Sequence, residues 1–107
     1  MLFMTLKQIQ DEVDKWTSQF KPQYWTPHQI FARLGEEVGE VGREINHLYG
    51  PKPKKSSEDK RDIGEEIGDV IFTLVCLANS QGISLDESWK VVMDKCYKRD
   101  NQRYERR

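Results

Sequence analysis

We predict an all-α fold for this 107-residue chain, with four helices arranged as an up-down bundle. Apolar residues recur at intervals of three or four positions in four separate segments, and none of these segments shows the two-residue alternation of a strand. Residues that begin or end helices stand between the segments, and most of the intervening stretches are short. Because the length suits one domain, residues 1–107 are predicted to form a single helical domain.

The first predicted helix covers Leu6–Phe20, and the second runs from Pro27 to a stop at Gly50-Pro51. Each begins with a capping box, in which a hydroxyl side chain and a Gln three residues later bond each other's backbone amides: Thr5 with Gln8, and Thr26 with Gln29. These boxes fix where the two helices start.

The third predicted helix covers Glu58–Ser80, with Gly82 as its stop, and the fourth begins at Leu85 behind a further capping box, Ser84 with Glu87. The stretch 51–57 contains prolines and lysines and is predicted to be a mobile basic loop. Residues 100–107 are predicted to form a basic tail.

Composition excludes several classes of protein. Seventeen basic residues balance 18 acidic ones, and the net charge of −1 argues against binding nucleic acid or anionic membranes through bulk charge. The longest apolar stretch, Val70–Ala78, is too short to span a membrane, and the first residues do not have the pattern of a secretory signal. Cys76 and Cys96 stand alone, so we expect buried reduced thiols and a cytoplasmic protein.

The second and third helices carry similar groups of acids: Glu36-Glu37-Val38-Gly39-Glu40 and Glu65-Glu66-Ile67-Gly68-Asp69. At about 100° per residue, the acids of each group flank the apolar stripe rather than lie behind it. Helix packing would bring like charges together unless a cation sat between them. Mg²⁺ suits such carboxylates and keeps positions open for phosphate oxygens. A di-iron site is disfavoured, because neither group has the Glu-x-x-His spacing; solvated surface acids are the alternative.

These residues resemble the signature of the MazG-type nucleotide pyrophosphohydrolases, and specifically the short single-domain bacterial members of the all-α NTP pyrophosphatases. That signature is EExxE, a variable spacer and ExxD, and here 25 residues separate Glu40 from Glu66. The resemblance extends to the residues around both acidic groups and covers most of the chain, including the first helix and the Arg99-Asp100 segment.

The resemblance implies a metal site and a reaction. It makes Mg²⁺ ligands of four acids, with Mn²⁺ as a substitute metal: Glu37, Glu40, Glu66 and Asp69. The implied reaction converts a (d)NTP into a (d)NMP and pyrophosphate, and removes unwanted nucleotides from the pool. Glu36 is our candidate for the group that holds or deprotonates the attacking water. Family members work as dimers or tetramers, so a homodimer or homotetramer is expected.

Substrate contacts are predicted from cations and aromatic rings. Lys95, Arg99 and Arg103 are spaced by four, which places them on one helical stripe suited to phosphate; the first two resemble the family's Lys-x-x-x-Arg. Trp25 lies in a connector, where it could stack on a nucleobase, whereas Trp16 fits the apolar stripe of the first helix and is predicted to be core. Three glycines on the flank of the second helix opposite its acids indicate close approach of another helix: Gly35, Gly39 and Gly42.

Two alternatives stay open at this point. A phosphoribosyl-ATP pyrophosphohydrolase would share the helical architecture and the acids but act on another substrate. A non-catalytic helical module that binds nucleotide or protein would form no product. The four acids favour an enzyme, because a binding module has no need of clustered carboxylates.

Overall fold

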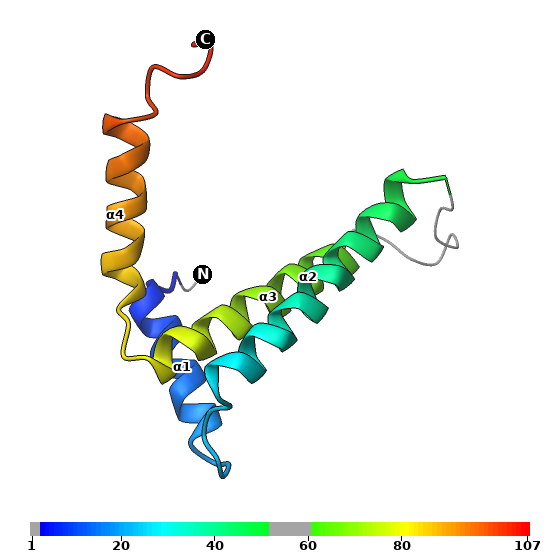
Figure 1. Ribbon diagram of the computed structural model, residues 1–107, viewed down its shortest axis with the longest axis vertical. Coiled ribbons are helices and arrows are strands. Elements are labelled where there is room, and N and C mark those ends of the chain that lie inside the picture. The colour runs from blue at the N-terminus through cyan, green and yellow to red at the C-terminus, as the bar shows by residue number, and fades with distance from the viewer. Residues whose placement is uncertain (1–2, 52–60) are drawn as a thin grey trace.

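The computed structural model describes residues 3–51 and 61–107, and this part of the chain contains four helices and no strand, which confirms the all-α fold. The helices are α1 (Leu6–Thr17), α2 (Pro27–Tyr49), α3 (Arg61–Ser80) and α4 (Leu85–Lys98) (Figure 1). The predicted mobile loop, apart from residue 51, and the predicted first turn of the third helix lie outside the described residues.

The helix starts follow from the capping residues. The Thr5–Gln8 box and the Thr26–Gln29 box are both present with both of their hydrogen bonds. At α4, the Ser84 hydroxyl accepts from the Glu87 amide at 3.3 Å, which is one half of the predicted box. Gly82 ends α3 as predicted, because its φ of +66° is a left-handed conformation that favours glycine.

α1 ends at Thr17, three residues before the predicted Phe20. The chain tightens there into i→i+3 turns, in which the Phe20 amide donates to the Thr17 carbonyl at 3.0 Å. The helical spacing of apolar residues continues through this segment although the helix does not. That spacing therefore predicted the side on which Phe20 lies but not its backbone conformation.

α2 and α3 lie side by side as a long antiparallel pair, and α1 packs across the end of α3 (Figure 1). The buried apolar side chains of the described residues come from α1, α2 and α3: Val13, Ile30, Val75 and Ala78. Trp16, which we predicted to be core, is 53% exposed. Cys76 is half-buried, but Cys96 is exposed, so the prediction of two buried thiols is wrong for Cys96.

α4 does not close a bundle with α2 and α3 within one chain. It packs principally against α1, and the chain bends by 112° between α3 and α4, so that α4 leads away from the α2–α3 pair (Figure 1). No residue of α4 is buried. The radius of gyration is 17.1 Å, against about 13 Å for a compact chain of this length. The four helices thus form an open V.

Within the described residues, no single helix has the length and apolarity needed to cross a membrane. α3 and α4 meet those criteria only when they are counted together across their bend.

Candidate metal centre and its cavity

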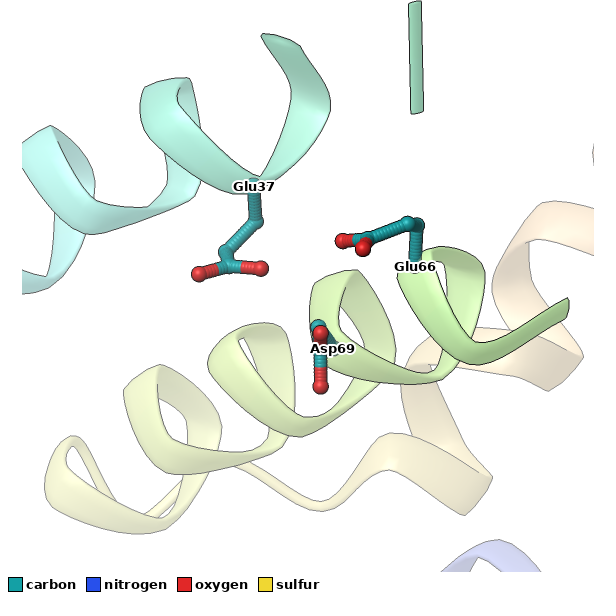
Figure 2. Close-up of side chains that lie close together, drawn as sticks. All are labelled: Glu37, Glu66 and Asp69. Atoms are coloured by element: carbon teal, nitrogen blue, oxygen red, sulfur yellow. The ribbon is translucent and has the colours of Figure 1, made fainter. Parts of the chain in front are cut away.

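Three of the four predicted metal ligands meet between α2 and α3. Carboxylate oxygens of Glu37, Glu66 and Asp69 lie within 4.8 Å of one another. Figure 2 shows Glu37 reaching across from α2 toward Glu66 and Asp69 of α3. Two antiparallel helices bring them together because Glu66 and Asp69 are one turn apart on the side of α3 that borders α2.

The group is graded in burial, from a buried Glu37 through a half-buried Glu66 to an exposed Asp69. Glu37 is only 6% exposed, and its Oε1 lies 2.9 Å from Nη2 of Arg33, one turn earlier on α2. A buried carboxylate needs such a partner, since desolvation of an unpaired charge is costly. The group therefore opens to solvent on the Asp69 side and is anchored by an ion pair on the Glu37 side.

Glu66 experiences the accumulated negative charge. Its pKa is raised above the ordinary value, first because its surroundings desolvate the carboxylate and then because of the charges of Asp69, Glu40, Glu37 and Glu44. The raised pKa indicates an arrangement that is unfavourable for carboxylates alone.

The donor set fits a hard divalent cation. All three ligand groups are carboxylates, whose oxygens Mg²⁺ and Mn²⁺ accept, and three protein ligands leave further positions for water or phosphate. A cation among these oxygens would also remove the repulsion that raises the pKa of Glu66.

The other two predicted acids lie outside this group. The Oε2 atom of Glu40 lies 3.5 Å from Nη1 of Arg43 at an exposed position, although the charge of Glu40 still acts on Glu66. Glu36 has a side chain that is 67% exposed, and its Oε2 lies 3.1 Å from Nη1 of Arg33. Glu40 is therefore a peripheral carboxylate, and Glu36 shares its guanidinium partner with Glu37.

A cavity of about 600 Å³ adjoins the acids, with Glu37, Asp69 and Arg33 in its wall. Much of the remaining wall is aromatic, supplied by α1, the α1–α2 connector and α3: Trp16, Phe20, Tyr24, Trp25 and Phe72. The Trp16 ring packs edge-to-face on Phe20 and Phe72, at centroid distances of 4.9 and 5.9 Å. Trp16 is exposed because it faces this cavity rather than a core.

A hydrogen-bond network fixes the connector that walls the cavity. The Tyr24 hydroxyl donates to Asp14 at 2.7 Å and accepts from the Asn79 amide at 3.0 Å. The Asn79 side-chain carbonyl in turn accepts from Gln10 at 2.9 Å, and Gln10 also accepts from the Leu85 amide at the start of α4. One network thus joins α1, the connector, α3 and the start of α4.

The predicted phosphate-binding cations lie elsewhere in the chain. Lys95 is on α4, and Arg99 and Arg103 both contact Asp100, at 2.9 and 3.0 Å. These hydrogen bonds lower the pKa of Asp100, with Arg99 as the larger cause. None of the three cations lines the cavity, and α4 leads away from the α2–α3 pair (Figure 1). α4 ends at Lys98 with Arg99 as its C-cap, so Arg103 lies beyond the helix and the prediction of a single helical stripe is wrong for Arg103.

Three residues near the site were not predicted from the sequence. Arg33 precedes Glu37 by four positions, a spacing that indicates an ion pair. Glu44, which is 5% exposed, follows Glu37 by seven, so helical periodicity places it on the same inward face. Phe72 reaches the cavity through the packing of α1 on α3, and no local pattern reveals such a contact.

We expect Glu66→Gln to stabilise the metal-free protein, because it removes a charge from a crowded acidic group. Between the ordinary pKa of a glutamate and the raised pKa of Glu66, the folded state binds more protons than the unfolded state. The contribution of Glu66 to stability therefore falls as pH rises through that window. The advantage of the variant should grow with pH across the window and then level off, as measured by urea unfolding in EDTA.

Glu65→Gln is the matched control, because Glu65 is the exposed neighbour on the same helix. Equal gains in both variants, or a gain that shrinks with rising pH, would contradict a specific role for the acidic group.

Comparisons with known proteins indicate one family. The family model of the MazG nucleotide pyrophosphohydrolase domain matches residues 25–104, a range that contains both acidic segments. YpjD of Bacillus subtilis (strain 168) is 54% identical over 103 residues, which cover 96% of this chain and 93% of YpjD. YvdC of the same organism is 36% identical, over 82% of this chain and 92% of its own.

Two solved structures share the fold. The crystal structure of Bacillus subtilis YpjD aligns with a TM-score of 0.82 and 56% identity, over 89% of this chain and 97% of that one. The Bacillus-conserved MazG protein, a nucleotide pyrophosphohydrolase, aligns with a TM-score of 0.80 and 43% identity, over 92% and 96% of the two chains. With its acidic group between α2 and α3, this chain belongs to the MazG nucleotide pyrophosphohydrolase family.

Proposed function

We propose that this protein is a cytoplasmic, Mg²⁺-dependent nucleoside triphosphate pyrophosphohydrolase that converts (d)NTP into (d)NMP and pyrophosphate and clears unwanted nucleotides. The observation that carries the proposal is the meeting of Glu37, Glu66 and Asp69 oxygens within 4.8 Å beside a cavity with aromatic walls. Membership of a pyrophosphohydrolase family makes the phosphoanhydride of a nucleotide the bond that such a site would cleave.

In this proposal the three clustered carboxylates hold the metal, and Glu40 adds negative charge at its edge. Bound Mg²⁺, or Mn²⁺ in its place, would neutralise the polyphosphate and increase the acidity of an attacking water. The cavity would take the nucleoside, with Trp25 and its aromatic neighbours stacking on the base. Stacking of this kind tolerates different bases, which is consistent with a clearing activity.

The test is a panel of (d)NTPs and phosphoribosyl-ATP, each incubated with protein and Mg²⁺ and resolved by ion-exchange chromatography. We expect a nucleoside monophosphate and pyrophosphate in equal amounts from one or more (d)NTPs, and no product in EDTA. Orthophosphate with a diphosphate, or no turnover across the set, would refute the reaction. Turnover of phosphoribosyl-ATP alone would assign the other substrate.

Glu36 is proposed to orient or deprotonate the attacking water, because it neighbours Glu37 and its carboxylate is held by the same Arg33 guanidinium. Glu36→Gln should lower kcat by about 10²–10⁴-fold, the usual range for loss of a general base, without weakening Mn²⁺ binding measured by electron paramagnetic resonance. An unchanged kcat would make Glu36 a solvated surface residue.

We also propose that the protein works as a homo-oligomer, a homodimer or homotetramer. The chain exposes 9067 Å², whereas a compact monomer of 12.7 kDa exposes about 6,200 Å². The surplus contains long exposed apolar stripes, including Phe31, Val38 and Ile45 at intervals of seven residues on α2. Lys95, Arg99 and Arg103 would then bind phosphate only at the site of another copy, since α4 leads away from the α2–α3 pair of its own chain (Figure 1).

A further inference from the structure

Arg33 stands between the metal centre and the aromatic cavity. Its guanidinium contacts two carboxylates, with Nη2 at 2.9 Å from Glu37 and Nη1 at 3.1 Å from Glu36. The Arg33 side chain is 51% exposed and lines the cavity together with Glu37 and Asp69. It therefore touches a buried metal-ligand candidate while remaining accessible from the space that we assign to the nucleotide.

The positive charge of Arg33 matters because the substrate and the metal centre are both negatively charged. A nucleoside triphosphate brings several negative charges to a cavity whose wall already carries Glu37 and Asp69, so cations must lie close to the phosphates. Among the described residues that line the cavity, Arg33 is the only cation. Lys95, Arg99 and Arg103 of the same chain do not approach it.

We propose that Arg33 binds a phosphate group of the nucleotide at the edge of the metal centre, an inference that rests on the proposed function. A guanidinium has five N–H donors, and the two carboxylate contacts leave others available on a side chain that lines the cavity. Arg33 can therefore keep Glu37 in place and donate to a phosphate oxygen at the same time. Its planar fork suits phosphate better than the point charge of a lysine.

The test separates phosphate binding from metal binding. Wild type, Arg33→Gln and Arg33→Lys are titrated with Mn²⁺ alone, then with an α,β-methylene nucleoside triphosphate in Mn²⁺, and then with the nucleoside. Isothermal titration calorimetry gives the affinities, and tryptophan fluorescence reports occupancy because Trp16 and Trp25 line the cavity. Arg43→Gln is the matched control, since Arg43 pairs with Glu40 on the same helix but does not line the cavity.

We expect Arg33→Gln to weaken binding of the triphosphate analogue by about 10- to 100-fold, the range of a lost charge-assisted hydrogen bond. The nucleoside should bind as it does to wild type, and Mn²⁺ alone should lose less affinity than the analogue does, because Arg33 also anchors Glu37. Arg33→Lys should fall between the two, and Arg43→Gln should match wild type.

Two outcomes would overturn the inference: unchanged analogue affinity in Arg33→Gln, or an equal loss for Mn²⁺ alone, which would make Arg33 only a support for Glu37. Circular dichroism establishes that each variant folds, and Arg33→Lys retains a cation should Arg33→Gln unfold. A wild-type protein that neither binds the analogue nor hydrolyses any (d)NTP would overturn the proposed function and this inference together. Turnover by wild type with full analogue affinity in Arg33→Gln would overturn this inference alone.

Discussion

Replacing Glu37 with glutamine should abolish metal-dependent pyrophosphohydrolysis. Glu37 is the buried member of the acidic group, and its carboxylate reaches across from α2 to the two acids of α3 (Figure 2). A neutral amide is a poor ligand for Mg²⁺ and leaves only the α3 pair to hold it. We expect kcat/KM to fall by on the order of 10³-fold, which is the scale of losing one well-placed electrostatic group in a reaction that develops charge.

The fold should survive this change. Arg33 keeps Glu36 as a partner, and the loss of one negative charge relieves Glu66. Far-ultraviolet circular dichroism should therefore be unchanged, while Mn²⁺ binding measured by electron paramagnetic resonance is lost. Glu65→Gln, an exposed change on α3, should keep full turnover. A Glu37→Gln protein with wild-type turnover would remove Glu37 from the metal centre.

Local features of the fold were predictable because their causes are local. A threonine and a glutamine three residues apart satisfy free amides whatever surrounds them, and both boxes form as expected. The proximity of Glu37 to Glu66 and Asp69 could also be predicted from the sequence, because two similar acidic segments on consecutive helices become neighbours once those helices pair.

The position of α4 could not be predicted from the spacing of apolar residues in the sequence. An apolar stripe says which face of a helix is covered but not which chain covers it. Trp89, Val92 and Cys96 are spaced by three or four residues and so share one face of α4, yet all three are exposed in this chain. The same limit applies to Trp16, whose stripe position is compatible with a core or with a cavity wall. Both differences arise from long-range packing.

Disrupting the outer face of α2 should dissociate the protein and lower its thermal stability strongly. Ile45 is 46% exposed and continues the Phe31–Val38 stripe, whereas its neighbour Asn46 lies off that stripe. If a second copy covers the stripe, Ile45→Glu buries an unpaired charge at the contact, and Asn46→Glu does not. Light scattering with size exclusion should give a dimer or larger for wild type and Asn46→Glu, and a monomer for Ile45→Glu.

Ile45→Glu should also lower the thermal stability of the protein strongly. A standard interface removes about 800 Å² from each partner, which is less than the surplus of the 9067 Å² exposed here over the roughly 6,200 Å² of a compact monomer. Since obligate oligomers have no stable folded monomer, the Tm of wild type should rise with protein concentration. The Ile45→Glu protein should melt with low cooperativity or be unfolded at room temperature. A monomeric wild type with a sharp, concentration-independent transition would contradict the oligomer.

Gly42 supplies an independent check on the same face. A Cβ built at Gly42 meets no atom of this chain within 4 Å. In an isolated chain, Gly42→Ala should therefore stabilise α2 by about 1 kcal/mol through helix propensity alone. If a helix of a second copy packs closely there, the added methyl group displaces it, and the variant should dissociate at higher protein concentration than wild type does. Dilution and urea unfolding thus show whether Gly42→Ala stabilises or destabilises the protein. Destabilisation on dilution would mean that Gly42 lies at a contact between copies.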